Sequence, residues 1–162
     1  MRKLMTASLL VPAVTLGACG VHKPAQRAAT TGGPAVPSIK ACELMTQPEA
    51  EAAVGQTLPN VAENAVLGTC SRAAKDFSAG ADLTVGEWAS IKTSATSGTV
   101  PVPVSGVGDE ALNLNGSNGS LLYVRKGSKG FLLVLNGFRI DHSPDHGLAL
   151  EKELASKVLS RL

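Results

Sequence analysis

The chain has 162 residues, of which 15 are basic and 13 acidic, and its net charge is +2. Arg2 and Lys3 are the only charged residues before position 19, so 15 less 2 leaves 13 basic groups against 13 acidic ones in the remainder. A nucleic-acid partner would need a concentrated basic face and usually stacking aromatic side chains. Beyond the short group Arg125, Lys126 and Lys129 the sequence offers neither, and we expect no nucleic-acid partner.

The first 18 residues have the pattern of a secretory signal. The basic pair at the start is followed by an apolar stretch, residues 4–15, which Pro12 interrupts. This stretch is too short to cross a bilayer as a stable helix. Residues 1–18 are therefore expected to direct export and to be removed.

The signal ends in Leu16-Gly17-Ala18-Cys19, and this run resembles the lipobox of bacterial lipoproteins. In that family the cysteine thiol carries a diacylglycerol and becomes the first residue of the mature chain. The resemblance implies that Cys19 is lipidated, with acyl chains such as palmitate, and that the membrane is a partner of the protein through this anchor. The alternative is a free cysteine inside an ordinary cleaved signal.

Residues 19–39 are rich in Ala, Pro, Thr and Gly and show no periodicity that could organise a packed element. Such composition is typical of a flexible tether. About twenty residues of this kind have a root-mean-square span on the order of 25 Å. We expect the tether to hold a single folded domain, residues 40–162, clear of the lipid headgroups.

Cys42 and Cys70 remain as the only possible pair once Cys19 is assigned to lipid. Export places them in an oxidising compartment, where such pairs usually form disulfides. A redox dithiol and a metal pair are the alternatives, although no Cys-x-x-Cys spacing favours either. We expect a disulfide.

The domain begins with a capping box, in which Thr46 caps a helix and Glu49 reaches back to it. This helix is expected to run to Gly55, with Leu44, Ala52 and Val54 facing the core. Residues 67–76 and 81–88 are predicted to be strands, and residues 93–98 a loop or mobile tip.

The second half of the domain predicts a meander. Residues 100–104 alternate valine with proline, which confines them to a sheet edge or to an extended segment outside the sheet. Residues 111–114, 121–125 and 131–138 are predicted strands joined by glycine-containing turns, and the last is apolar enough to be central and covered on both faces.

The last segment predicts an amphipathic helix that packs on the sheet, with Ser143 as its cap and Pro144 at its first position. The order of elements indicates an α+β fold, an antiparallel sheet of about four to six strands with an N-terminal and a C-terminal helix.

The domain also resembles a broad set of small bacterial lipoproteins of uncharacterised function. The likeness covers nearly the whole domain and is carried by a Cys-x-Leu-x-Thr-x-x-Glu motif from Cys42, by Cys70, by a Gly-x-Gly-Asp-Glu-Ala motif from Gly106 and by residues 123–127. It implies the same location and fold, and it implies no catalytic residue.

Residues 106–111 also fit a dinucleotide-binding pattern, but that chemistry needs a strand before the glycines and a helix after them. Here a proline-rich stretch precedes and an apparent strand follows, so a tight turn is the preferred interpretation and no cofactor is expected. His142 and His146 are the candidate metal ligands, although they would not share one helical face, so we predict no metal site there.

The candidate binding residues belong to no known catalytic motif. They are Trp88, Asp109, Glu110 and Arg125. Adjacent acids such as Asp109 and Glu110 point to opposite faces of a strand, so a solvated turn is favoured over a catalytic pair. Single aromatics such as Trp88 and Tyr123 are more often core or rim residues than ligand platforms.

These observations favour a lipid-anchored cell-envelope domain that is not an enzyme and that binds an envelope protein or a small ligand, through its sheet or through the loops around residues 92–119. Two alternatives remain open. One is an envelope hydrolase or metal-dependent enzyme that uses His142, His146 or the acids near position 109, and the other is a structural component of an envelope assembly.

Replacing Cys19 by alanine should leave the protein unprocessed or soluble, because the thioether cannot form without the thiol. Labelling cells with a radioactive fatty acid and fractionating membranes measures this directly. Equal labelling of the Cys19→Ala variant and the parent would refute lipidation at Cys19.

Overall fold

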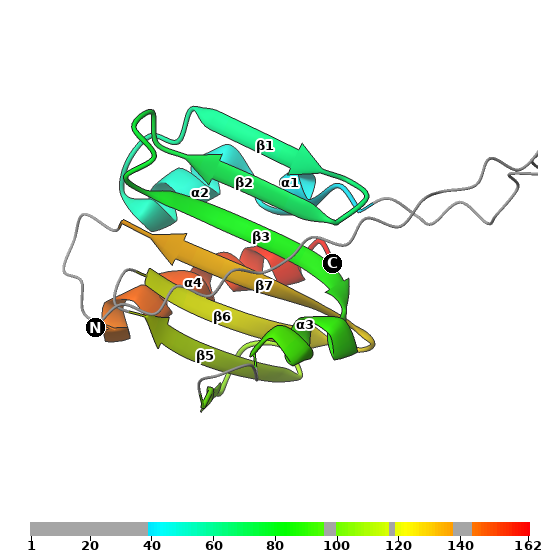
Figure 1. Cartoon of the computed structure of the whole chain (residues 1–162). Coiled ribbons are helices and arrows are strands. Elements are labelled where there is room, and N and C mark those ends of the chain that lie inside the picture. The colour runs from blue at the N-terminus through cyan, green and yellow to red at the C-terminus, as the bar shows by residue number, and fades with distance from the viewer. Residues whose placement is uncertain (1–38, 96–99, 117–118, 138–143) are drawn as a thin grey trace, which may run out of the picture. The chain divides into compact units, whose positions relative to one another are not determined.

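A computed structural model describes residues 39–95, 100–116, 119–137 and 144–162, all within one compact unit, Val36–Leu162 (Figure 1). The predicted signal, nearly all of the predicted tether, Cys19, His142 and Ser143 lie outside the described residues.

The described residues form helices and strands that alternate in a mixed order along the chain. The helices are α1 (Ala41–Leu44), α2 (Gln47–Val54), α3 (Trp88–Ala95) and α4 (Pro144–Leu159). The strands are β1 (Asn60–Asn64), β2 (Thr69–Ala73), β3 (Gly80–Glu87), β4 (Val102–Val104), β5 (Glu110–Gly116), β6 (Gly119–Lys126) and β7 (Lys129–Asn136).

All seven strands join one sheet in the order β1-β2-β3-β7-β6-β5-β4, and every neighbouring pair is antiparallel. The α+β class is confirmed, but the expected four to six strands were too few. β1 was not predicted from the sequence, because this edge strand has no buried residue and therefore no apolar alternation. The proline-containing strand β4 forms the opposite edge, as predicted.

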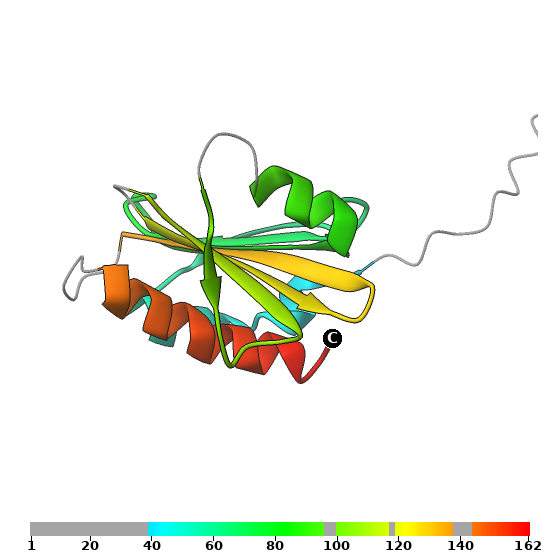
Figure 2. The same cartoon turned by 90° about the horizontal axis from the view of Figure 1, so that it is seen from below.

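The sheet separates two hydrophobic clusters. α1, α2 and α4 lie on one face and α3 lies on the other, as Figure 2 shows for α3 and α4. The larger cluster contains Leu83, Leu122, Leu133 and Leu154, and the smaller one joins Ile91 and Ala95 of α3 to Tyr123.

β7 is the central strand that the run of apolar residues predicted. Phe131, Leu133 and Leu135 are fully buried in the larger cluster, and Leu132 packs against the smaller one on the other face. A strand with apolar side chains at consecutive positions is stable in water only where both of its faces are covered. The sequence pattern of β7 therefore requires helices on both sides of the sheet.

The capping box at the start of α2 is confirmed. Glu49 accepts hydrogen bonds from the backbone N–H and the hydroxyl of Thr46, and Gly55 ends the helix in the left-handed conformation at φ 76°. One core assignment was wrong: Ala52 is exposed and Ala53 is buried in its place, because the helix buries the side that includes Ala50 and Val54.

Cys42 and Cys70 are joined by a disulfide, which confirms the predicted pair. The bond ties α1 to β2, and the buried side chain of Arg72 adds a second link between these elements by donating to the carbonyl oxygens of Met45 and Cys42. α1 and Met45, the residue that follows it, are thereby held against the sheet.

The predicted loop at residues 93–98 was wrong for residues 93–95, since helix α3 extends from Trp88 to Ala95, and residues 96–98 lie outside the described part of the chain. The strand predicted over 81–88 ends one residue earlier, at Glu87. The chain is rich in Ser and Thr here, which favours loops locally, but Ile91 and Ala95 recur four residues apart and bury one face of the helix on the sheet.

Residues 106–109 form the predicted tight turn, and the segment leads into β5 rather than into a helix. Gly108 has a φ of 60°, and a Cβ atom there would lie 2.4 Å from the carbonyl oxygen of Arg125. Glycine is required at this position by both the backbone conformation and the close approach.

Replacing Leu154 by alanine should lower the free energy of unfolding by about 2 to 5 kcal/mol, because the side chain is 1% exposed and its loss leaves a cavity beside Leu133 and Leu135. Lys157→Ala is the control, since its side chain is 38% exposed and only pairs with Glu153, and it should cost less than about 1 kcal/mol. Equal denaturation midpoints for the two variants would contradict the packing of α4 on the sheet.

Candidate functional site

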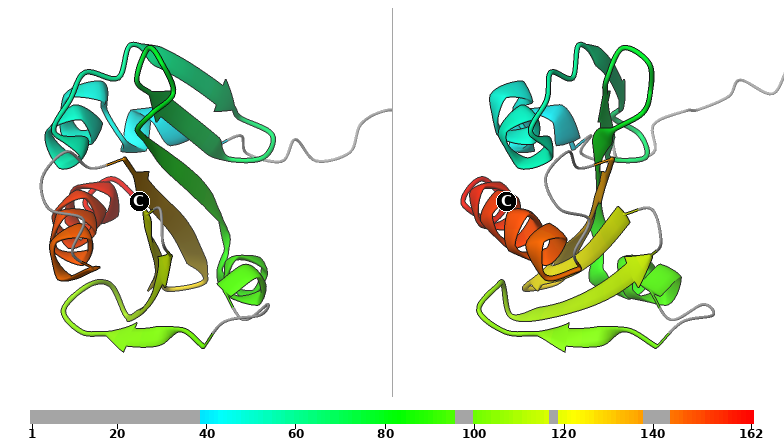
Figure 3. Two further views of the ribbon diagram at one scale, coloured as in Figure 1. Left: turned by 60° about the vertical axis from the view of Figure 1, so that its left-hand side comes forward. Right: turned by 90° about the vertical axis from the view of Figure 1, so that its left-hand side faces the viewer.

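The sheet has one covered face and one open face. α1, α2 and α4 pack on the covered face, whereas α3 is the only described element that packs on the other, which we call the open face (Figure 3). A helix of eight residues cannot cover seven strands. Much of the open face is therefore formed by the side chains of the strands themselves.

The half of the open face over β1, β2 and β3 carries short polar side chains. Since side chains alternate between the two faces of a sheet, the register places Thr69 and Ser71 of β2 beside Thr84 and Asp82 of β3 on this face. All four side chains are partly exposed. This half of the open face therefore presents hydroxyl and carboxyl groups on short side chains.

The other half of the open face, over β5, β6 and β7, carries an apolar strip. Leu114, Leu121 and Val134 are register neighbours across three strands and are all partly exposed. Leu114 and Leu121 also pack against the cluster that α3 forms with Tyr123. The open face thus combines a polar surface with an adjoining apolar strip.

A group of charged side chains links α3 to β5 and β6. Glu110 of β5 accepts a hydrogen bond of 2.7 Å from Lys92 of α3 and forms an ion pair of 3.4 Å with Arg125 of β6. The Lys92 ammonium also lies 5.7 Å from the centre of the Trp88 ring, within the range of a cation–π contact. These four residues form what we call the Glu110 cluster.

The Glu110 cluster holds its carboxyl group in the ionised form. The hydrogen bond from Lys92 lowers the pKa of Glu110, and the charges of Lys92 and Arg125 lower it further against the opposing effect of burial. A carboxylate with a lowered pKa is a weaker base than an ordinary one. The cluster therefore suits attachment of α3 and recognition of polar groups better than proton transfer.

The structure brings together three of the four binding candidates named from the sequence: Trp88, Glu110 and Arg125. The carboxylate of Asp109 takes no part in this group, because it accepts a hydrogen bond of 2.7 Å from the backbone N–H of Gly127, while the Asp109 backbone N–H donates to the carbonyl oxygen of Arg125 at 2.9 Å. Asp109 and Glu110 thus have different partners, and Glu110, as the first residue of β5, does not lie in the solvated turn that the sequence favoured for both acids. His146 lies on α4, on the covered side of the sheet.

A buried polar group between α4 and the sheet was missed by the sequence analysis. Glu151 of α4 is fully buried, and its Oε2 atom accepts hydrogen bonds from the Ser120 hydroxyl at 2.5 Å and from the Asn113 amide at 3.3 Å. Its Oε1 atom has no hydrogen-bond partner among the described residues. The signal in the sequence is a glutamate at a core-facing position, three residues before Leu154 and seven before Val158.

Burial raises the pKa of Glu151 to about 8, although the hydrogen bond from Ser120 acts in the opposite direction. At neutral pH the carboxyl group is therefore mainly protonated and uncharged in the folded protein. Because no solvent reaches the side chain, this group has no access to a substrate at the surface.

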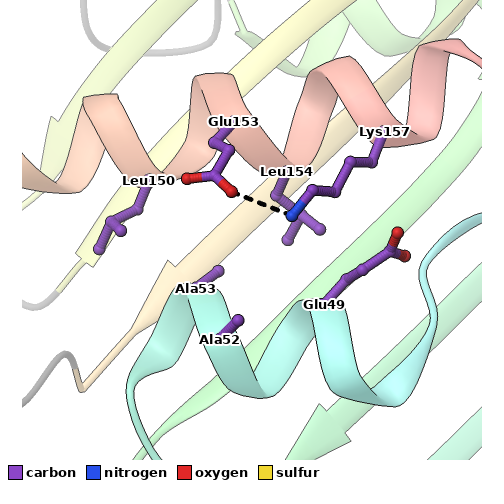
Figure 4. A pocket seen from close by; sticks show the side chains of 7 residues that line it. All are labelled: Glu49, Ala52, Ala53, Leu150, Glu153, Leu154 and Lys157. Carbon is purple, nitrogen blue, oxygen red and sulfur yellow. Dashed lines mark hydrogen bonds and ion pairs between the residues drawn. The ribbon is translucent and has the colours of Figure 1, made fainter.

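Helices α2 and α4 border a small hollow on the covered side, with a volume of about 100 Å³ (Figure 4). Pockets that hold small organic ligands typically measure about 300 to 1,000 Å³. Glu49, which lines the hollow, accepts hydrogen bonds from Arg161 on both carboxylate oxygens, at 2.8 and 2.6 Å. This interaction is the main reason why the pKa of Glu49 is lowered to about 2. The hollow is too small for a cofactor.

Within the described residues, no three His, Cys, Asp or Glu side chains come close enough to hold a metal ion together. His142 lies outside these residues. That His142 and His146 form no metal site therefore stays a prediction. No helix in the described part of the chain is long and apolar enough to cross a membrane.

Comparison with protein-family models, with curated proteins and with solved structures gives no match. The surface of the sheet and the positions of the acidic side chains are therefore the basis for assigning a function.

The buried carboxyl group predicts a pH-dependent stability. Below pH 4.5, the ordinary pKa of a glutamate, both the folded and the unfolded states hold the Glu151 proton. Between pH 4.5 and about 8 only the folded state holds it, so the free energy of unfolding falls as the pH rises through this window.

Glu151→Gln should remove this dependence, because glutamine stays neutral and has a similar shape. We expect the variant to unfold at about the same denaturant concentration as the parent at pH 4 and to be more stable by about 1 to 3 kcal/mol at pH 8. Glu153→Gln, an exposed position on the same helix, should change stability by less than about 0.5 kcal/mol at either pH. A constant difference between the Glu151 variant and the parent from pH 4 to 8 would contradict the raised pKa.

Proposed function

We propose that this protein is a non-enzymatic, lipid-anchored domain of the bacterial cell envelope that binds another envelope protein through the open face of its sheet. The observation that carries this proposal is the unequal covering of the two faces. Three of the four described helices lie on one face, and the other keeps a polar surface and an apolar strip within reach of a partner.

A protein partner fits the open face better than a small ligand does. Small ligands bind in concave pockets that bury most of their surface, whereas the open face is the side of a sheet with short side chains. Specific protein interfaces bury roughly 800 Å² on each partner and combine an apolar centre with polar surroundings. The strip formed by Leu114, Leu121 and Val134 would supply the apolar part, and the hydroxyl groups of β2 and β3 the polar part.

The side chains that an enzyme would use support the binding role. Glu110 is held ionised between Lys92 and Arg125, Asp109 stabilises the turn at Gly127, and Glu151 is enclosed between α4 and the sheet. Each of these acids has a structural task at its own position. A catalytic pair would need two of them beside a common substrate position.

The envelope location rests on residues 16–19 and on the cysteine pair. The sequence Leu-Gly-Ala-Cys supports lipidation of Cys19, and the bond between Cys42 and Cys70 agrees with an oxidising compartment. The lipid would hold the domain at the membrane surface, where the open face could meet other envelope proteins.

A photoreactive amino acid at Ser71, on the open face, should crosslink to one partner of defined mass in intact cells. The same amino acid at Ser156, an exposed serine on the outer side of α4, is the matched control and should give no such product. Thr69→Arg, two residues from Ser71 on the same face, should reduce the Ser71 product at least about fivefold while leaving the denaturation midpoint unchanged. Equal products at the two serines, or none at Ser71, would count against the open face as the binding surface.

A further inference from the structure

The turn between β1 and β2 presents two large apolar side chains to solvent. Val66 is 90% exposed and Leu67 is 65% exposed, although nothing in a turn requires apolar residues. Polar residues are the usual choice at such positions. We call these two residues the Val66–Leu67 tip.

The backbone holds the Val66–Leu67 tip in a fixed shape. The side-chain oxygen of Asn64 accepts hydrogen bonds of 3.1 Å from the backbone N–H groups of both residues. The following residue, Gly68, has a φ of 63° and accepts a hydrogen bond of 2.8 Å from the N–H of Val85 in β3. The two side chains are therefore displayed on a turn that is fastened to the sheet.

The tip lies at the end of the sheet where the chain enters the domain. Glu63, the residue before Asn64, accepts a hydrogen bond of 2.9 Å from the backbone N–H of Cys42 in α1. Its register partner Cys70 is joined to Cys42 by the disulfide. Figure 1 shows α1 beside this end of β1 and β2, so the first described helix and the tip lie at the same end of the sheet.

Most of the charged side chains on the elements next to the tip form ion pairs. Lys40 pairs with Glu43 at 2.8 Å, and Lys129 pairs with Glu87 next to the end of β3. The carboxylate of Glu63 accepts a hydrogen bond from the backbone N–H of Cys42, a neutral donor that leaves its formal charge in place, so these five side chains sum to −1. This arrangement fits an apolar contact with an uncharged surface better than attraction to an anionic one.

We propose that the Val66–Leu67 tip inserts into the boundary between headgroups and acyl chains of the membrane that anchors the protein. This inference rests on the lipid anchor at Cys19 in the proposed function. With the chain already attached, contact by the tip is an intramolecular event, so two apolar side chains suffice to set an orientation. The strands then point toward the membrane, and the open face stays accessible from the side.

Quenching of a single tryptophan by brominated lipids tests the contact. The full-length chain, purified from cells that process and export it and carrying Trp88→Phe, receives either Leu67→Trp at the tip or Phe77→Trp at the turn between β2 and β3. Phe77 is the matched control, because it is also an exposed apolar turn residue, at 75%, but lies at the opposite end of β2. Zwitterionic phosphatidylcholine vesicles with brominated acyl chains are the probe.

We expect quenching at position 67 to exceed quenching at position 77 at least about twofold, because only the tip reaches the acyl boundary. Adding Val66→Asp to the Leu67→Trp chain should reduce its quenching to the level at position 77. Denaturation midpoints equal to that of the chain carrying Trp88→Phe alone would confirm that all variants are folded.

Flotation of the same vesicles separates the two claims. If the full-length chain floats and the two positions are quenched equally, the tip proposal is overturned while the anchor stands. If the full-length chain fails to float, the anchor itself is wrong and the tip proposal falls with it. Flotation together with selective quenching at position 67 supports both.

Discussion

The covering of β7 is the constraint on which the rest of this fold depends. Its consecutive apolar residues must be buried on both faces, and the chain meets this requirement with helices of unequal size. α4, with 16 residues, joins α1 and α2 on one side, and α3, with eight, covers part of the other. The strands far from α3 are then left with one face in solvent. The open face is therefore a consequence of how the central strand is buried, and its short polar side chains are what solvent exposure allows.

The parts of the fold that were predictable from sequence are those with a local signal. The capping box at Thr46, the meander and the central position of β7 each follow from residues close together in the chain. The errors share one cause, which is that tertiary contacts decided the outcome. β1 is stabilised by pairing with β2 rather than by its own composition, and α3 by burying Ile91 and Ala95 despite its loop-forming residues. The Glu110 cluster could be named only in part, since Lys92 reaches Glu110 across 18 positions.

Glu151 shows a cost that local patterns do not reveal. An apolar residue at this position would complete the buried side of α4, yet the chain places a carboxyl group there and supplies Ser120 and Asn113 as partners from two strands. Hydrogen bonds require a defined geometry, whereas apolar contacts tolerate sliding. The buried group can therefore fix the position of α4 along the sheet. Such a role explains why the chain keeps Glu151 although its burial lowers the free energy of unfolding as the pH rises from 4.5 to about 8.

The free energy of transferring Val66 and Leu67 into the membrane decides whether these two side chains can orient the domain. Transfer of Val66 and Leu67 from water to an apolar surface contributes roughly 2 to 4 kcal/mol in total. A free domain gains little from this, because an association free energy of about 4 kcal/mol corresponds to a dissociation constant near 1 mM. A domain attached through a tether of about twenty residues is already confined at an effective concentration in the millimolar range. Under those conditions the same contact is occupied for much of the time, so a lipid anchor makes a small apolar tip sufficient and a larger membrane-binding surface unnecessary.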